Sequence, residues 1–252
     1  RHTRLRTVTG VQTCALPIYP WADAIVAVSQ GVAENLLQET GLPPERVETI
    51  YNPVVTPTLV AQAQEPLPHP WLTPEAPPVV LGVGRLHYQK DFATLLRAFA
   101  QVRTQRPARL LILGEGTQRE ELEKLARALG VEKAVEFPGF VRNPFAFMSR
   151  AGVFVLSSAY EGLPGVLIQA LACGCPVVST DCPSGPEEIL AGGRYGRLTP
   201  VGDAGALAEA ILAELAQPAA RGLRLQRAQD FTLERAADQY WTVLMKPEET
   251  RP

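Results

Sequence analysis

The chain has 252 residues and a formal net charge of −2, from 24 basic and 26 acidic side chains. This near balance of charge gives no indication of binding to nucleic acid or to an anionic membrane surface. No apolar run approaches the length of a membrane span, and the length allows one large domain, or one domain with part of another.

The four cysteines do not form a metal-binding pattern. Cys14, Cys173, Cys175 and Cys182 lack the paired CxxC spacing that is typical of zinc sites. Three of them lie in or beside apolar segments, where a reduced cysteine behaves as a small hydrophobic residue. We therefore expect a protein of the reducing cytoplasm without a bound metal.

Residues 1–18 differ from the rest of the chain. They contain no acidic residue, show no hydrophobic period, and begin with Arg rather than Met. Within them, residues 11–18 resemble the translated sequencing-adapter read-through found at broken ends of assembled genes. We therefore expect residues 1–18 to be a non-native leader outside the fold.

Residues 19–55 predict a strand, a helix and a second strand. Apolar residues 24–28 form the first strand, Ser29 is a suitable N-cap for the helix that follows, and Gly41 ends that helix. Residues 47–51 have the apolar and β-branched character of the second strand.

Residues 56–77 are rich in Pro, Gln and Ala and lack a hydrophobic period. Such a composition favours an extended linker. Trp71 and Leu72 either pin this linker to a surface or fill a local groove.

From residue 78 to residue 230 the chain alternates between predicted strands and helices. Strands are expected at 79–83, 109–113, 134–137, 153–156 and 176–180. Helices are expected at 92–102, 117–129 and 166–173, from Asn143 and from Asp203, and a last helix begins near Thr232, within residues 231–252. Thr117 and Glu120 have the spacing of a capping box. The alternation predicts a parallel sheet with helices on both faces and ligands at the carboxyl ends of its strands.

The turn after the first of these strands carries two cations. In the run Gly82-Val83-Gly84-Arg85-Leu86, the position of a third glycine is taken by His87, so the run is not a dinucleotide fingerprint. Arg85 follows the strand and Lys90 precedes the next helix, an arrangement that suits a diphosphate. The alternative is that both are solvated basic residues.

Residues 160–180 read as loop, helix, turn and strand. Gly162, Pro164 and Gly165 break regular structure before an apolar helix, and a glycine-rich loop that leads into a helix N-terminus suits a phosphate. Glu161 and Gln169 frame this site, and either can bind sugar hydroxyl groups. The alternative is that Glu161 is a solvated loop residue and Gln169 a surface amide.

Together these motifs resemble the donor-binding half of the family 4 retaining glycosyltransferases. The resemblance is carried by Gly84-Arg85-Leu86 with Lys90-Asp91-Phe92, by Glu161-Gly162-Leu163-Pro164 and Gln169, by Pro176-Val177-Val178, and by Ser184-Gly185-Pro186. The usual second glutamate of the family is Gln169 here, which keeps the geometry and loses a charge.

The resemblance covers roughly residues 19–245 and implies the GT-B fold, in which two Rossmann-like α/β domains face each other. It assigns residues 78–230 to the second, nucleotide-sugar-binding domain and residues 19–55 to a remnant of the first, acceptor-side domain. Residues 231–252 would be a helix that crosses back to the first domain, and a tail. The resemblance thus implies a chain truncated at its N-terminus.

It also implies roles for individual residues. Arg85 and Lys90 would neutralise the donor diphosphate and, with Glu161, act in catalysis, while Glu161 would position the sugar and Gln169 the ribose. The donor-binding residues would be Gly84, Arg85, Lys90, Gly114, Val141, Glu161, Gly162, Leu163, Pro164, Gly165, Val166 and Gln169. The backbone near Val141 would face the base, which leaves the base unspecified. No metal or cofactor is implied beyond the nucleotide-diphosphate sugar itself.

The implied reaction is sugar transfer, with retention, to a glycan or lipid-linked acceptor in cell-surface glycan synthesis. The implied location is the cytoplasm, with peripheral attachment to the inner face of the cell membrane left open, and the chain by itself is expected to be inactive. Two alternatives stay open. One is a nucleotide-sugar epimerase of the same fold, which would turn over its nucleotide-sugar without an acceptor, and the other is a non-catalytic module that only binds the nucleotide.

Overall fold

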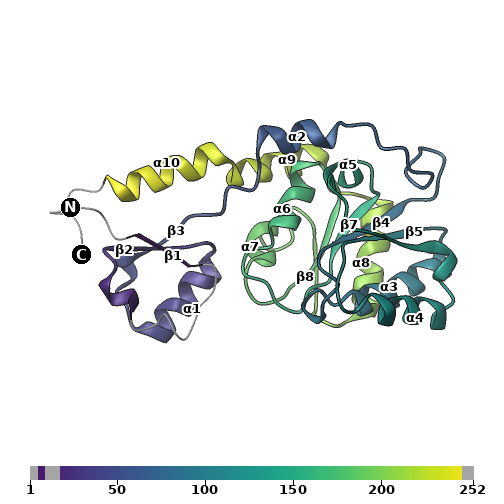
Figure 1. Cartoon of the computed structure of the whole chain (residues 1–252), viewed down its shortest axis with the longest axis horizontal. Helices are drawn as coiled ribbons and strands as arrows, with labels where there is room; N and C mark the ends of the chain where they lie inside the picture. Colours follow the sequence, from purple (N-terminus) through teal and green to yellow (C-terminus); the bar gives the residue numbers. More distant parts are fainter. Residues whose placement is uncertain (1–4, 9–17, 246–252) are drawn as a thin grey trace.

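The computed structural model describes residues 5–8 and 18–245, which form two parallel sheets (Figure 1). The larger sheet has six strands in the order β6-β5-β4-β7-β8-β9. Their bounds are β4 Val79–Val83, β5 Arg109–Leu113, β6 Val135–Gly139, β7 Val153–Leu156, β8 Val177–Thr180 and β9 Arg197–Thr199. All neighbouring strands are parallel. The direction of winding reverses between β4 and β7, and a ligand crevice is expected beyond the carboxyl ends of the strands at such a point.

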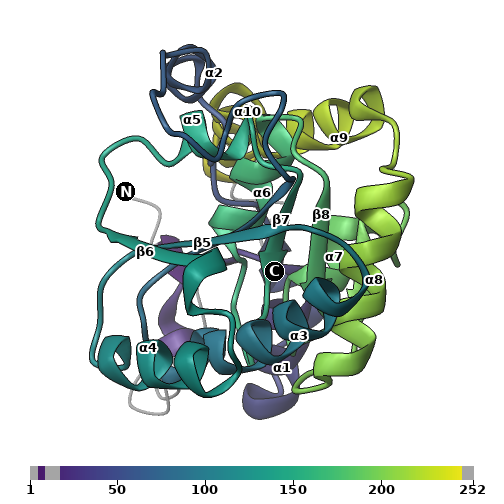
Figure 2. The same ribbon diagram turned by 90° about the vertical axis from the view of Figure 1, so that its right-hand side faces the viewer.

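Helices cover both faces of this sheet, as the alternation in the sequence predicts (Figure 2). One face carries α3 Phe92–Gln105, α4 Arg119–Ala128 and α8 Ala204–Ala216. The other carries α2 Pro57–Ala63, α5 Phe145–Met148, α6 Gly165–Ala172, α7 Pro186–Leu190 and α9 Arg221–Ala228. Both sets bury apolar side chains against the strands, so the sheet lies in the middle of three layers.

The strands supply both cores because their side chains alternate. Within β7, Val153 and Val155 belong to the cluster with α3, whereas Phe154 and Leu156 belong to the cluster with α6. Phe154 is fully buried, and burial of a side chain of this size contributes about 1.5–3 kcal/mol. A central strand that is apolar on both faces explains the continuous apolar run in the sequence.

The smaller sheet has the order β1-β2-β3 and packs against α1 on one face. Its elements are β1 Leu5–Val8, β2 Ala24–Ala27, α1 Gln30–Thr40 and β3 Val47–Thr49. The side chain of Ser29 caps α1, and Gly41 ends it with a φ of 63°, both as predicted. Ile25 and Leu36 are fully buried in the core of this sheet.

Strand β1 corrects the expectation that all of residues 1–18 lie outside the fold. Leu5–Val8 pairs in parallel with β2, from Leu5 opposite Ala24 to Val8 opposite Ala27. A four-residue edge strand is too short to show a hydrophobic period, which is why the sequence pattern missed it. The rest of that segment, including Cys14, lies outside the described residues apart from Ile18.

The chain crosses between the two sheets twice, and the crossings lie side by side. The backbone N–H groups of Val54 and Val55 both donate to the carbonyl of Phe231, at 3.0 Å each. Val55 also forms a parallel bridge with Thr232. After the second crossing, α10 Leu233–Leu244 packs with Val26 and Ile50 of the smaller sheet (Figure 1).

Some local predictions were wrong. The segment 56–77 is not wholly extended, because Thr56 caps α2 with its side chain, and α2 buries Leu59 and Ala63 against the larger sheet. The capping box predicted for Thr117 is not formed, and α4 starts after Gln118 without a side-chain cap.

The sequence also gave no indication of α7, β9 and α9. The first two have five and three residues, too few for a period to be seen, and α9 buries few of its residues.

No helix in the described parts of the chain combines the length and the apolar character needed to cross a bilayer.

Candidate functional site

A cleft of about 460 Å³ opens at the carboxyl ends of β4, β5 and β6. Its lining consists of Val83, Gly84, Arg85, Leu113, Gly114, Glu115, Phe140, Val141 and Pro144. Gly84, Arg85, Gly114 and Val141 are thus brought together as the sequence predicts. The volume lies within the range of small-molecule sites in proteins.

Two glycines let the strand ends approach closely enough to shape this cleft. Gly114 has a φ of 137°, and a side-chain carbon there would collide with the carbonyl oxygen of Gly84. Only glycine tolerates both the angle and the contact. Gly84 in turn lies against the side chain of Lys90. A Cβ added to Gly84 would lie 3.2–3.3 Å from the aliphatic carbons of Lys90, so Lys90 is close to the rim of the cleft.

Arg85 presents an exposed cation to the cleft. Neighbouring Glu115 is occupied elsewhere, since its Oε1 lies 2.8 Å from Nη1 of Arg119. Arg85 itself takes part in no ion pair within the described residues, so its charge is available to an anion.

Lys90 follows β4 and Glu161 follows β7, the two strands between which the winding reverses, and their side chains face each other. Nζ of Lys90 lies 2.5 Å from Oε1 of Glu161, and the two side chains are 17% and 9% exposed. The hydroxyl of Ser158 donates to the same carboxylate oxygen at 2.6 Å. The hydroxyl of Ser157 donates to the backbone carbonyl of Lys90 at 2.7 Å, which ties the turn before α3 to the end of β7.

The glycine-rich loop leads into α6, as predicted, and leaves its N-terminus open. Pro164 is the N-cap and offers no side-chain hydrogen bond, so the first N–H groups of α6, from Gly165 and Val166, are available to an anion. Leu163 packs against the core of the smaller sheet. A Cβ on Gly165 would lie 3.6 Å from Val54, so this loop contacts both halves of the molecule.

The N-terminus of α3 is not available to a ligand in the same way. Asp91 caps it, accepting a hydrogen bond from the N–H of Thr94 at 3.2 Å, and its carboxylate already occupies the positive end of the helix dipole. The sequence places Lys90 just before this helix, but the capped N-terminus of α3 does not add a dipole contribution to a diphosphate site at Arg85 and Lys90, and α6 is the better anion site.

Gln169 lies half-buried on α6, four residues beyond Gly165. Its side-chain amide has no hydrogen-bond partner among the described residues. Gly162 lies in the loop before α6 and is packed against Gly185. A Cβ added to Gly185 would lie 3.0 Å from the carbonyl oxygen of Gly162.

Cys182 lies close to this site without being suited to nucleophilic chemistry. Burial and the nearby charge of Glu161 raise the pKa of its thiol to about 11. At neutral pH it is therefore a protonated, buried side chain.

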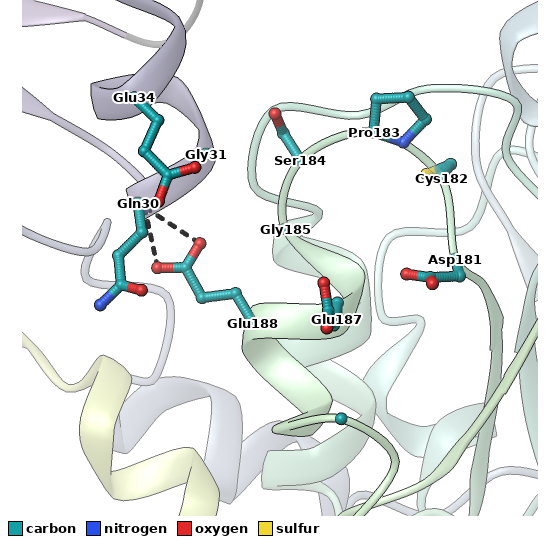
Figure 3. A pocket seen from close by; sticks show the side chains of 11 residues that line it. Gln30, Gly31, Glu34, Asp181, Cys182, Pro183, Ser184, Gly185, Glu187 and Glu188 are labelled. Atoms are coloured by element: carbon teal, nitrogen blue, oxygen red, sulfur yellow. Dashed lines mark hydrogen bonds between the residues drawn. The ribbon is translucent and has the colours of Figure 1, made fainter. Parts of the chain in front are cut away.

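The sequence alone assigned no role in the site to the side chain of Phe140 or to the loop of residues 181–185. The side chain of Phe140 is 79% exposed at the mouth of the cleft, and an aromatic residue directly after a strand's carboxyl end was the available signal. The loop lines a second hollow of about 530 Å³, between α1 and α7 (Figure 3). Four of its lining residues are acidic, namely Glu34, Asp181, Glu187 and Glu188.

Within the described residues, no group of three or more His, Cys, Asp or Glu side chains is arranged to hold a metal ion.

Comparison with known proteins gives a consistent picture. A family profile described as "Glycosyl transferases group 1" matches residues 77–217, and one described as "Glycosyltransferase Family 4" matches residues 8–57. An N-acetylgalactosamine-N,N'-diacetylbacillosaminyl-diphospho-undecaprenol 4-alpha-N-acetylgalactosaminyltransferase of Campylobacter jejuni is 36% identical over 184 residues, which are 73% of this chain and 48% of the relative.

The lipopolysaccharide core biosynthesis glycosyltransferase LpsE of Rhizobium meliloti is 34% identical over 227 residues, 88% of this chain and 64% of the relative. The chain thus spans between about half and two thirds of these two relatives. The apo structure of the lipopolysaccharide outer core galactosyltransferase WaaB matches with a TM-score of 0.74 at 27% identity, over 92% of this chain and 64% of that one. The chain therefore belongs to the family 4 glycosyltransferases and shares the GT-B fold of its structural neighbours.

Proposed function

We propose that the cleft and the Lys90–Glu161 pair bind a nucleotide-sugar donor. The complete protein would transfer the sugar, with retention of its anomeric configuration, to a glycan or lipid-linked acceptor in cell-surface glycan synthesis. The observation that carries this proposal is the position of the free cation of Arg85 and of the Lys90–Glu161 pair around the carboxyl ends of β4 and β7. In an open parallel sheet that position is the ligand site.

The residues can be assigned to the parts of the donor. The base and ribose would occupy the cleft beside Val141, with Gln169 as a further hydrogen-bond partner for the ribose. The diphosphate would lie between Arg85, Lys90 and the open N-terminus of α6. Glu161 would then hold hydroxyl groups of the sugar.

Such an arrangement supports bond cleavage at the sugar. As the bond from C1 to the diphosphate oxygen breaks, C1 becomes oxocarbenium-like and negative charge grows on the leaving diphosphate. Cations and helix N–H groups that are already in place stabilise this charge without reorganisation. In our proposal the protein supplies this stabilisation without a metal, and retention is proposed on family membership alone.

The acceptor class is suggested by the names of the relatives. That of the Campylobacter enzyme specifies a saccharide on diphospho-undecaprenol, and that of LpsE specifies the lipopolysaccharide core. We propose an acceptor of the same kind and, because such acceptors are anchored in a bilayer, a cytoplasmic protein that associates peripherally with the membrane.

Calorimetric titration of uridine, UDP, GDP and ADP into the chain tests donor binding. Arg85→Ala should weaken the nucleoside diphosphate by about 1.5–3 kcal/mol, the usual contribution of a hydrogen bond to a charged group, and should leave the nucleoside nearly unaffected. Arg127→Ala is the matched control, because this exposed arginine lies in the last turn of α4, at the end of that helix away from the cleft. Equal weakening of uridine and UDP by Arg85→Ala would contradict the assignment.

Transfer itself is tested separately. That the chain on its own is inactive stays a prediction, and any transfer of sugar by purified residues 1–252 to a lipid-linked acceptor would overturn it. Turnover of a nucleotide-sugar without acceptor would favour the epimerase alternative instead.

A further inference from the structure

Glu188 connects the two sheets through three hydrogen bonds. It lies on α7, a helix that packs on one face of the larger sheet. Its carboxylate reaches the N-terminus of α1 (Figure 3). The backbone N–H of Gln30 lies 2.8 Å from Oε1 and 3.0 Å from Oε2. The phenol of Tyr51, which follows β3, donates to Oε1 at 2.7 Å.

The carboxylate fills a position that α1 leaves open. The first turn of α1 contains no acidic residue, and the side chain of Ser29 satisfies only the N–H of Val32. A negative charge at a helix N-terminus interacts favourably with the helix dipole, and charged hydrogen bonds are stronger than neutral ones. Glu188 therefore supplies from one half of the molecule the anion that the helix of the other half lacks.

Glu188 is itself held firmly. Arg227 of α9 donates to the backbone carbonyl of Glu188 at 2.6 Å and to that of Ile189 at 2.9 Å. Its remaining nitrogen, Nη1, lies 2.7 Å from Oδ2 of Asp230. Because these bonds fix the end of α7, the position of the Glu188 carboxylate is set by the larger sheet and α9 rather than by α1.

The same loop-helix unit touches the loop assigned to the donor sugar. The N–H of Glu161 donates to the carbonyl of Pro183 at 3.3 Å. A side-chain carbon on Gly185 would collide with Pro164, so the loop of residues 181–185 is packed tightly on that loop. A displacement of α7 would therefore move both the contact with α1 and the support of Glu161.

We propose that Glu188 is a positioning residue that fixes the smaller sheet and α1 against the donor-sugar loop. The link with catalysis rests on the proposed function and on the assignment of residues 19–55 to the acceptor-side domain, from which the acceptor would approach the donor. Glu188 would not touch the donor or the reacting atoms. It would set the angle at which the acceptor side meets the sugar held by Glu161.

The test compares Glu188→Ala and Glu188→Gln with Glu187→Gln in the chain of residues 1–252. Glu187 is the adjacent exposed carboxylate, and its side chain makes no hydrogen bond or ion pair in the part of the chain that the structure describes. Hydrogen exchange of the Gln30 amide, followed by NMR, reports the contact directly. The amide of Leu111 in β5 reports whether the larger sheet stays intact.

Glu188→Ala should speed exchange at Gln30 by about tenfold or more, while exchange at Leu111 and in Glu187→Gln stays unchanged. The exchange rate at Gln30 in Glu188→Gln should lie between those of the wild type and Glu188→Ala, because an amide oxygen still accepts one hydrogen bond but carries no charge. Glu188→Gln also provides the test if the alanine variant does not fold. Unchanged exchange at Gln30 in both Glu188 variants would overturn the contact.

In the complete enzyme, Glu188→Gln should lower kcat or raise the KM for the acceptor, while binding of the nucleoside diphosphate stays as in Glu187→Gln. Equal steady-state constants in the two variants would overturn the positioning role. Failure of the wild-type chain to bind any nucleoside diphosphate would instead count against the proposed function, and the exchange at Gln30 would still decide the role of Glu188 in holding the two sheets together.

Discussion

Nζ of Lys90 lies 2.5 Å from Oε1 of Glu161, so two side chains that the sequence assigns to different parts of the donor form one ion pair. The pair is mostly buried, and the hydroxyl of Ser158 also donates to Glu161. In the proposed complex the donor therefore meets a preformed cation and carboxylate rather than two separate flexible side chains.

Removal of one partner of this pair should be costly because the other is left buried without its counter-charge. Lys90→Ala and Glu161→Ala should each lower the free energy of unfolding by about 3 kcal/mol, and the double variant should lose less than the sum. Urea denaturation measures these values. The more exposed pair Arg119–Glu123, with side chains 35% and 36% exposed, is the control and should show a coupling of about 0.5 kcal/mol or less. Strict additivity at Lys90 and Glu161 would contradict the pairing.

The proposed contact of Gln169 with the ribose predicts different effects for two substitutions. Gln169→Glu should preserve binding of the nucleoside diphosphate, because a carboxylate also accepts hydrogen bonds from hydroxyl groups. Gln169→Leu removes the acceptor and should weaken binding by about 1–3 kcal/mol, measured by calorimetry. Gln226→Leu, on the exposed side of α9, serves as the control, and an equal affinity of the two leucine variants would show that Gln169 is a surface amide.

The close approach of the β4 and β5 turns predicts a strong effect of a single methyl group. Gly114→Ala combines a φ of 137° with a collision against the carbonyl of Gly84 and should cost about 2 kcal/mol or more of unfolding free energy. Gly222→Ala adds the same methyl group within α9, where no atom other than the neighbouring residues and the backbone of the helix itself lies within 4 Å, and should stabilise by about 0.5–1 kcal/mol. Thermal unfolding of both variants should thus shift in opposite directions.

Alkaline pH should destabilise the protein through buried weak acids. Burial and the carboxylate of Glu188 raise the pKa of Tyr51 to about 12, and burial raises the pKa of Cys173 and Cys175 to about 12 as well. Because these pKa values lie above those of the unfolded chain, the stability that the protonated groups contribute is fully present below about pH 8 and is lost as the pH rises towards 12.

Unfolding measured at several pH values between 8 and 11 checks this expectation. Tyr51→Phe keeps the thiols but removes the phenol, so its stability should fall less steeply between pH 10 and 11 than that of the wild type. Parallel curves for the two proteins would contradict the raised pKa of Tyr51 and the partial burial that causes it.

The larger sheet could be predicted because its strands and helices each carry a strong local signal. Val153–Leu156 is apolar at every position, and α8 starts after Asp203 as the sequence predicts. Oδ1 of Asp203 caps this helix by accepting from the N–H of Ala206 at 2.9 Å. Asn143 likewise accepts hydrogen bonds from the first N–H groups of α5. Such signals depend on neighbours in sequence, which a single chain reveals.

The pairing of Lys90 with Glu161 and the bonds of Glu188 could not be predicted in the same way. The partners are 71 residues apart in the first case and 158 in the second, and only the fold brings them together. Likewise, Leu5–Val8 forms a strand because β2 lies beside it. Interactions of this kind are set by tertiary structure, and residue type and spacing carry no record of them.

The paired crossings at Val54, Val55 and Phe231 restrict how the two sheets can move. Two adjoining segments that are hydrogen-bonded to each other allow fewer relative orientations of the two sheets than a single connecting segment would. Any separation of the two sheets would have to break the hydrogen bonds between Gln30 and Glu188, whereas the paired crossings would stay intact. Spin labels on α1 and α4 should accordingly report a narrow distribution of distances between the two helices.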